Sequence, residues 1–334
     1  MKSIGLICLL VLCSCGSGSS PAPVAVGPDS VDYTQYALKT PQQYGAGGFG
    51  ITDDSDSLEN SGKSFTLPGA LVLNGNFRIT RDIRLQKIVD LIGVSAQASQ
   101  ITGPAGGVYI YVTGQSPNLL SVYRNIKFVN VSIRYGFTTA DYGVGATIDS
   151  CEFDESGMGG FGTGGMPTAI EWKNNSWNTS INACSVRGCS DAAVRYALGA
   201  TGGNSGSNLK ITNTVIWDSV VGVMFDGNSL DGINAMLEAD NIEHCDTAMK
   251  VVNGGDGLIS VSDSHFELNR KFHVDSNGRT VVNLNNCWMG DNSAYPGFNF
   301  FSVGNANILV QGGRIMYRPE NLAISTGTGN VIIQ

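Results

Sequence analysis

The chain has 334 residues, of which only 14% are charged, and a formal net charge of −8. Roughly a quarter of the residues are charged in an average soluble protein, so long surface helices are not expected. The 44 glycines, with abundant Asn, Ser and Thr, favour short strands joined by tight turns. The acidic balance argues against binding to nucleic acid, because no Lys/Arg cluster is available to replace phosphate counterions.

The first residues predict export. Lys2 precedes an apolar run at residues 4–12, which is too short for a stable membrane anchor. The sequence LCSCG at residues 12–16 resembles a bacterial lipobox, which implies a lipoprotein signal peptide with Cys15 as the lipidated residue. Gly16 after it then favours the outer membrane. An ordinary cleaved secretory signal is the alternative interpretation.

A six-residue unit recurs from Tyr123 to the end of the chain. Every unit is apolar at positions one and six and has Asn, Asp, Ser, Ala or Gly at position three, and the starts lie 23 to 33 residues apart. A repeat of this length indicates a solenoid. The units are YRNIKF, IDSCEF, INACSV, ITNTVI, LEADNI, VSDSHF, LNNCWM and VQGGRI, which start at Tyr123, Ile148, Ile181, Ile211, Leu237, Val261, Leu284 and Val310.

The unit predicts a strand, a tight corner and a second strand. Positions one and six point inward, and position three needs a left-handed backbone, which Asn, Asp and Gly adopt most easily. A second apolar pair, such as Val194 with Tyr196 or Phe272 with Val274, indicates a further strand in each coil. Like positions then stack at roughly 4.8 Å. We therefore predict an all-β fold, a right-handed single-stranded parallel β-helix of about 8–10 coils.

Five cysteines lie within the repeat region. Cys151, Cys184 and Cys287 occupy position four, whereas Cys189 and Cys245 lie three residues past position six. No CxxC spacing is present, so a structural metal site is not expected. Cys151 and Cys184 belong to adjacent coils and could form a disulfide, but we favour small buried thiols in a packed stack.

The segment before the repeat resembles the start of pectate-lyase-like right-handed parallel β-helix proteins, a superfamily that includes polysaccharide lyases, polygalacturonases and many phage tailspikes. The resemblance rests on GAGGFGITDD at residues 45–54, LPG at residues 67–69 and LIG at residues 91–93. Phe49 stands where the family has Asp, and the helix that normally follows TDD is expected to be almost deleted. Over residues 42–334 the resemblance implies the fold rather than an activity.

These features divide the chain into four parts. We expect a lipoprotein signal peptide at residues 1–15, a Gly/Ser/Pro tether at 16–41, an opening segment with the first coils at 42–120, and the remaining coils at 121–334. The apolar strand at residues 331–334 has no capping helix, so we expect a partner or a homotrimer to cover it.

Polar residues are expected on the outward side of the strand after the long loop, the face on which this superfamily usually binds glycan. The Gly-His-Gly and Arg-x-Lys motifs of polygalacturonases are absent, so that mechanism is not carried over. A merely solvated face is the plain alternative. Alternation about the apolar pairs places on this predicted stripe Arg134, Glu171, Lys173, Arg195, Asp226, Lys250, His273, Asp275 and Asn299.

Two catalytic chemistries fit the predicted stripe. A glycosidase needs two carboxylates, about 6.5–9.5 Å apart for inversion, and Asp226 with Asp275 would be a loose inverting pair. A lyase needs a base beside a site that neutralises the carboxylate of a uronate. Arg195 or Lys250 would be the base, and Glu171 or Asp226 could help to hold calcium. No other cofactor is expected.

Substrate binding is expected from the other members of the predicted stripe, Arg134, Lys173, His273 and Asn299. Phe161, in the Gly-rich loop at residues 157–165, could stack on a sugar ring. That loop and the one at residues 199–207 could form a wall over the stripe, or could be decoration.

Three functions stay open from the sequence. The first is a cell-surface lipoprotein that binds, and in one version cleaves, an extracellular polysaccharide. The second is a phage tailspike-like protein that binds a receptor or depolymerises it, located in a virion tail. The third is a non-catalytic structural or adhesive rod.

Overall fold

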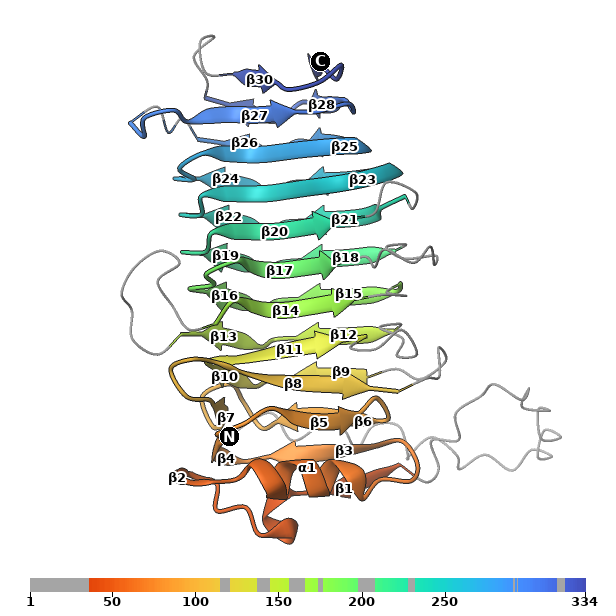
Figure 1. Cartoon of the computed structure of the whole chain (residues 1–334), viewed down its shortest axis with the longest axis vertical. Coiled ribbons are helices and arrows are strands. Elements are labelled where there is room, and N and C mark those ends of the chain that lie inside the picture. Colours follow the sequence, from red (N-terminus) through yellow and green to blue (C-terminus); the bar gives the residue numbers. More distant parts are fainter. Residues whose placement is uncertain are drawn as a thin grey trace, which may run out of the picture. The chain divides into compact units, whose positions relative to one another are not determined.

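The computed structural model describes residues 36–114, 121–136, 145–155, 166–173, 177–197, 208–227, 232–290, 292, 294–316 and 322–334. The described residues form a parallel β-helix in which every strand pairs in parallel with its equivalents in the coils before and after it (Figure 1). The predicted fold class is confirmed. Cys15 and the predicted signal peptide lie outside the described residues, and no described helix is long and apolar enough to cross a membrane.

Each coil contributes strands to three faces, here called sheets 1, 2 and 3. Sheet 1 holds β5 (Ile83–Gln86), β8 (Val108–Thr113), β11 (Val131–Tyr135), β14 (Thr168–Lys173), β17 (Ala192–Ala197), β20 (Val221–Asp226), the first parts of β23 (Thr247–Ser262) and β25 (Phe272–Asn285), β27 (Asn299–Val303) and β30 (Ala323–Ser325). Sheet 2 holds β1 (Ala37–Lys39), β3 (Gly69–Leu73), β6 (Val89–Gly93), β9 (Ser121–Arg124), β12 (Ala146–Asp149), β15 (Thr179–Asn182), β18 (Leu209–Thr212), β21 (Asn234–Glu238), the second parts of β23 and β25, β28 (Ile308–Gln311) and β31 (Val331–Ile333). Sheet 3 holds β2 (Phe49–Asp53), β4 (Gly75–Arg78), β7 (Ser99–Thr102), β10 (Lys127–Val129), β13 (Glu152–Asp154), β16 (Ser185–Arg187), β19 (Val215–Trp217), β22 (Asn241–Glu243), β24 (His265–Glu267), β26 (Trp288–Met289) and β29 (Arg314–Ile315).

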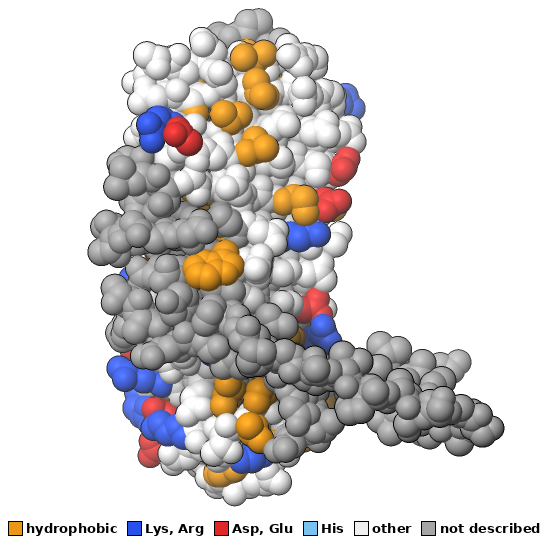
Figure 2. Space-filling view, turned by 90° about the vertical axis from the view of Figure 1, so that its right-hand side faces the viewer, with side chains coloured by type: hydrophobic (Ala, Val, Ile, Leu, Met, Phe, Trp, Pro, Cys, Tyr) orange, Lys and Arg blue, Asp and Glu red, His pale blue; other side chains and the backbone are white. Residues whose placement is uncertain are grey.

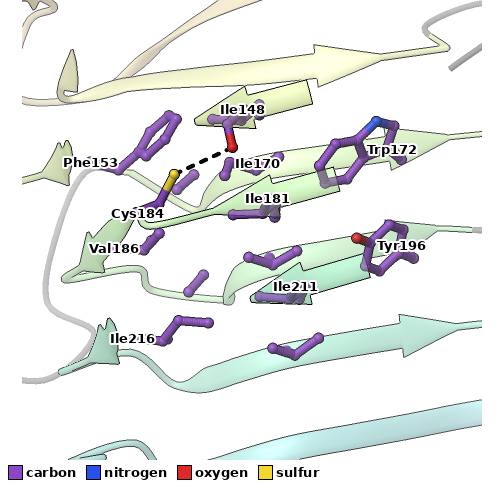
Figure 3. Close-up of a cluster of buried hydrophobic side chains, with 14 of the residues drawn as sticks. Ile148, Phe153, Ile170, Trp172, Ile181, Cys184, Val186, Tyr196, Ile211 and Ile216 are labelled. Carbon is purple, nitrogen blue, oxygen red and sulfur yellow. Dashed lines mark hydrogen bonds between the residues drawn. The ribbon is translucent and has the colours of Figure 1, made fainter. Parts of the chain in front are cut away.

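The core is built from columns of equivalent residues. Position one of the repeat forms a single buried column in sheet 2, because each residue pairs with the next along Tyr123, Ile148, Ile181, Ile211, Leu237, Val261, Leu284 and Val310. Position six forms a second column in sheet 3, with Phe153, Val186 and Ile216 stacked in Figure 3. Sheet 1 adds an aromatic stack in which Trp172 lies 5.0 Å from Tyr196 between ring centroids. The repeat therefore defines the core as predicted.

The corner between sheets 2 and 3 has a left-handed backbone in every repeat. All eight position-three residues have φ between 51° and 64°. Ser150, Ala183 and Ala239 adopt this conformation without being Asn, Asp or Gly, although it costs an L-residue roughly 1–2 kcal/mol. A second left-handed series, not foreseen from the sequence, follows position six by two residues at Asn130, Gly188, Asp218, His244 and Leu268.

Small polar groups and thiols fill the first corner from inside. The residues at position four are buried in seven of the eight units, Gly313 being the exception, and the thiols there and past position six are free, as predicted. Burial raises the pKa of the Cys287 thiol to about 11 and that of Cys245 to about 12, so both stay protonated and unreactive at neutral pH. The Sγ of Cys184 contacts the carbonyl oxygen of Ile148 at 3.6 Å (Figure 3).

Asp240 occupies the same position and is only 2% exposed. The Thr214 backbone N–H donates to its Oδ1 at 2.9 Å, while Oδ2 has no hydrogen-bond partner. Desolvation raises the pKa of this carboxyl to about 7, against the smaller lowering effect of its hydrogen bonds. Asp240 is thus a buried carboxyl group whose pKa lies near neutral pH.

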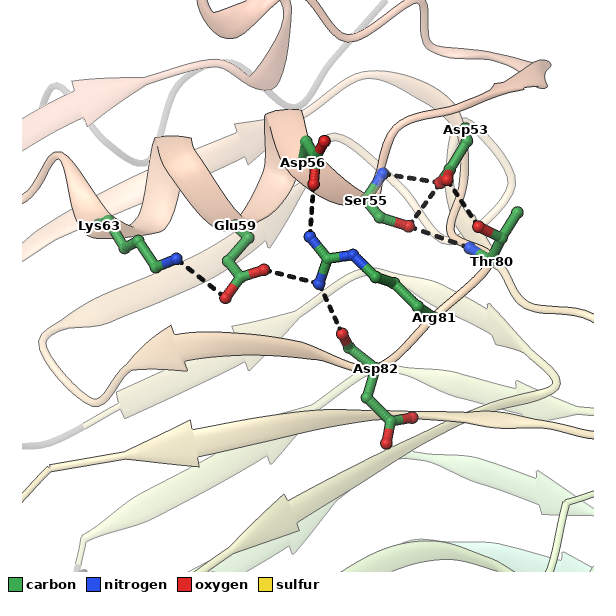
Figure 4. A network of polar contacts seen from close by, with 8 residues as sticks. All are labelled: Asp53, Ser55, Asp56, Glu59, Lys63, Thr80, Arg81 and Asp82. Carbon is green, nitrogen blue, oxygen red and sulfur yellow. Dashed lines mark hydrogen bonds and ion pairs between the residues drawn. The ribbon is translucent and has the colours of Figure 1, made fainter.

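The opening segment contains a helix, so the expected deletion of the helix after TDD is wrong. The 3₁₀-helix η3 (Pro41–Tyr44) and the α-helix α1 (Ser55–Lys63) cover the first coil. Leu58 is the one large apolar residue of α1 that is buried, which explains why no helical periodicity is visible. Ion pairs hold α1 instead: Arg81 contacts Asp56 at 2.5 Å and Glu59 at 2.7 Å (Figure 4). Strand β1 lies inside the predicted tether and pairs with β3.

Charged side chains are sparse on the face seen in Figure 2, where they stand mainly near the two edges, with isolated apolar side chains between them. This distribution agrees with a chain in which 14% of the residues are charged. Clusters of charged side chains on the described surface are therefore candidates for a functional site.

Replacing Ala183 with Gly should stabilise the protein by about 1 kcal/mol, because Gly adopts its φ of 51° without a Cβ clash and the side chain is exposed. The temperature of unfolding, followed by calorimetry, measures the effect. Ala146→Gly is the matched control, since Ala146 is a buried residue of β12 and should lose stability. Equal losses in the two variants would contradict the role given to the corner.

Replacing Asp240 with Asn should change how stability depends on pH. A carboxyl with a pKa of about 7 when folded and about 3.9 when unfolded holds a proton in the folded state, so the wild type loses stability as pH rises through this window. The Asn variant lacks that loss. The free energy of unfolding of the variant, relative to that of the wild type, should therefore rise by about 2 kcal/mol between pH 5 and pH 8. Thermal unfolding at a series of pH values measures it. Asp263→Asn, at an exposed corner, should show no such trend.

Candidate functional site

The structure places five residues of the predicted stripe in one outward row of sheet 1. The pairing runs from Arg134 to Glu171 and Arg195, then through Met224 to Lys250 and Asp275. The neighbouring outward row contains Lys173, Ala197 and Asp226. Alternation about the apolar pairs thus located most of the stripe.

The two aspartates proposed as an inverting pair are not brought together. Asp226 pairs with Val252, whereas Asp275 pairs with Lys250, so the aspartates lie two coils apart in different rows. Two steps of roughly 4.8 Å between strands and two residues along the strand separate their backbones by roughly 12 Å. The two carboxylates also contact different cations, Arg195 for Asp226 and Lys250 for Asp275, so they are not held together as a pair.

Every carboxylate of the predicted stripe is engaged in an ion pair. Glu171, whose side chain is 4% exposed, contacts Arg134 and lies 3.8 Å from the Nζ of Lys173. Asp226 contacts Arg195, and the Oδ2 of Asp275 lies 3.8 Å from the Nζ of Lys250. The row therefore joins consecutive coils through charges of opposite sign. This supports the solvated, structural interpretation of the stripe and gives no coordination site for calcium.

His273 is not on the outward side, and its prediction as a substrate-binding residue is wrong. It is fully buried, with Nδ1 3.1 Å from Asn269 Nδ2 and Nε2 2.9 Å from the carbonyl oxygen of Gly290. His273 and Val274 are neighbours and both fully buried, and the pairing of β25 includes Phe272 and Val274 but skips His273, which strict alternation does not allow for. Phe272 accordingly lies in an outward row, paired with Asn299.

Asn299 is therefore in a different row from Asp275, which pairs with Ser302. Phe161 and the two long loops lie outside the described residues. Among the residues that the structure describes, no group of three His, Cys, Asp or Glu side chains could hold a metal ion.

A pocket of about 310 Å³ lies on the outer face of sheet 3, which the sequence analysis did not consider. Its side chains come from β10, β13, β16 and β19. They flank the inward position-six residues and so point outward. The residues lining the pocket are Lys127, Glu152, Phe153, Asp154, Ser185, Arg187 and Trp217.

Two carboxylates share one cation at this pocket. The Nζ of Lys127 lies 3.5 Å from Glu152 Oε2 and 3.3 Å from Asp154 Oδ2. Glu152 and Asp154 are two residues apart on β13, with side chains on the same side of the strand, so their backbones are roughly 7 Å apart. Because one ammonium group lies within 3.5 Å of both, the two carboxylates are close enough to act together on one glycosidic bond.

An aromatic ring forms the opposite side of the pocket. The Arg187 guanidinium lies 4.3 Å from the ring centroid of Trp217, and its Nε lies 3.1 Å from Asp218 Oδ2. The Trp217 Nε1 is buried and has no hydrogen-bond partner. An indole, a guanidinium and two carboxylates around one hollow can stack on a sugar ring and bind its hydroxyl groups.

The signal for this site was present in the repeat. Positions five and seven of each unit flank the inward position six, and at Lys127, Glu152, Asp154, Arg187 and Trp217 they carry most of the functional groups of the pocket. These positions lie on a different strand from the predicted stripe, and their common place in the coil becomes visible only when equivalent positions of successive units are aligned.

No family model matches the sequence, and no curated protein matches it. Among solved structures, the chain is similar to the enzymatically active domain of tailspike protein 2 of bacteriophage CBA120, with a TM-score of 0.53, 11% identity, and coverage of 87% of this chain and 51% of that one. Tailspike protein 4 of the same phage, also as its enzymatically active domain, gives a TM-score of 0.52 and 17% identity over 86% and 43% of the two chains.

ORF18 of Geobacillus virus E2 gives a TM-score of 0.50 and 13% identity, covering 89% of this chain and 61% of that one. This chain thus spans about half the length of these phage proteins. At such identities the likeness shows the fold alone, the parallel β-helix.

Proposed function

We propose that this chain binds a polysaccharide on the outer face of sheet 3 and hydrolyses it at the pocket around Glu152 and Asp154. The observation that carries the proposal is the pair of carboxylates on one strand that share the Lys127 ammonium group, beside the half-buried ring of Trp217. The tailspike likeness supports the choice of ligand only as an analogy of fold.

Hydrolysis would use the two carboxyl groups in different protonation states. One carboxyl group, in its protonated form, donates to the oxygen of the glycosidic bond, and the other, ionised, takes a proton from a water that attacks the opposite face of the sugar. Lys127, within 3.5 Å of both carboxylates, holds the two side chains together. Trp217 holds the sugar ring by stacking. In this proposal the ion pairs of the predicted stripe have a structural role.

A tailspike-like receptor-binding protein is the second candidate, because the three phage proteins above share the fold over more than four-fifths of this chain. This candidate requires assembly as a homotrimer, which light scattering of the purified chain measures. A non-catalytic adhesive rod is the third, and it predicts that the pocket carboxylates contribute only to binding.

Export and anchoring through Cys15 are part of the proposal, on the basis of the lipobox-like sequence at residues 12–16. In a bacterial host, metabolic labelling with a radioactive fatty acid should mark the wild type, and Cys15→Ser should abolish the label. Cys13→Ser is the matched control and should keep it. Label that persists in Cys15→Ser would rule out Cys15 as the lipidated residue.

Glu152→Gln and Asp154→Asn should each lower the rate of polysaccharide cleavage by roughly 10²-fold or more, because each removes a proton-transferring group, while the folded state and the binding of substrate persist. Release of reducing ends from a panel of polysaccharides measures the rate. Asp275→Asn is the control on the predicted stripe and should leave it unchanged. Loss of activity in Asp275→Asn alone, or release of unsaturated uronates by the wild type, would contradict the proposal.

A further inference from the structure

The outer face of sheet 3 continues beyond the pocket with an unusual set of side chains. On β22, β24 and β26 the residues that point outward are Asn241, Glu243, His265, Glu267 and Trp288. Trp288 lies three strands beyond Trp217, roughly 14 Å along the solenoid. The two half-buried indoles therefore stand on one continuous surface.

The position of the Trp288 ring depends on Gly290. A Cβ at residue 290 would lie 3.0 Å from the outer ring of the indole, so the absence of a side chain there lets the indole lie across the strand. The His265 ring meets the indole edge to face, with centroids 4.1 Å apart and planes at 79°. His265 thus supports the Trp288 ring at one edge.

Two polar groups on β22 and β24 lack hydrogen-bond partners. The Oδ1 of Asn241 is buried without a hydrogen-bond partner, and the Nε2 of His265 lies 3.4 Å from Glu267 Oε2 without a regular hydrogen bond. A buried acceptor without a donor is costly. The carboxylate of Glu267, whose side chain is 36% exposed, is the acceptor on this surface that a ligand can reach.

The charge of this surface restricts the ligand. Glu243 pairs directly with Glu267 in the next coil, so two like charges are neighbours in the sheet, which is unfavourable without a partner of opposite charge. Together with the pocket, Asp218 and Arg314, which pairs with Trp288, the surface carries three cations and five carboxylates, a net charge of −2 with His265 neutral. A chain of uronates would be repelled, whereas neutral or amino sugars would be accepted.

We propose that Trp288, His265 and Glu267 form a second sugar subsite, which holds a neutral or amino sugar of the same polysaccharide that the pocket cleaves. The inference rests on the proposed function, and it adds the class of sugar. The pyranose ring stacks on Trp288 while Glu267, whose side chain is 36% exposed, accepts hydrogen bonds from its hydroxyl or amino groups.

Nitrogen-15 labelling of tryptophan tests the subsite, because the indole N–H signals of Trp217 and Trp288 can be assigned by replacing each with Phe. Monosaccharides at high concentration make the probe independent of linkage. Glucosamine and N-acetylglucosamine should shift the Trp288 signal saturably, and glucuronate at least roughly threefold more weakly. The signal of Trp172, a fully buried core residue, serves as the internal control and should not move.

The outcomes separate the two proposals. A shift at Trp217 with none at Trp288 would refute the second subsite and leave the proposed function standing. No shift at either indole would overturn both. A glucuronate response equal to that of glucosamine would refute the selection by charge.

Two glycine variants provide a further test. Gly290→Ala should displace the Trp288 ring and weaken its monosaccharide response by roughly tenfold, while cleavage at the pocket persists. Gly106→Ala is the matched control, because a Cβ there meets nothing within 4 Å, and it should leave the response unchanged. An unchanged response in Gly290→Ala would show that the ring position is not what binds the sugar.

Discussion

The left-handed corner at position three is the constraint on which the rest of this structure depends. It turns the chain from sheet 2 to sheet 3 within two residues, with nearly the same φ in all eight repeats. Because the turn is always the same, positions one and six stay in register from coil to coil. The core columns follow from this register. The cost of holding residues such as Ala183 and Ala239 in this conformation is offset by burial of the apolar columns on either side.

The same register puts like positions next to each other on the outside, where equal charges repel. Sheet 1 avoids this, since Arg134, Glu171 and Arg195 alternate in sign along one row. Sheet 3 does not, because Glu243 pairs with Glu267. The juxtaposition of two carboxylates on this surface is one basis for our proposal that a ligand binds there. This contrast, rather than the number of charges, separates a structural row from a binding surface.

The repeat was predictable because its apolar positions and its turn residue recur together. What the sequence did not reveal depends on single residues. Helix α1 buries one large apolar side chain, Leu58, and its ion pairs to Arg81 come from a distant turn. His273 and Val274 are neighbours in β25 and are both buried, and strict alternation of inward and outward side chains does not predict this. The pocket residues were missed because they come from different coils. Their proximity becomes visible only when positions five and seven of successive coils are aligned, and this alignment requires the strand register of sheet 3.

The short strands of sheet 3 explain why a binding surface would be located there. Strands β19, β22 and β24 have three residues each and lie between two left-handed residues, as β22 does between Ala239 and His244. The outward side chains are thus held on a rigid frame at the spacing of the strands. A rigid site loses less conformational entropy when a ligand binds. A long polymer with a regular repeat is the kind of ligand that gains most from such a frame, because each of its units meets the same geometry one step further along the solenoid.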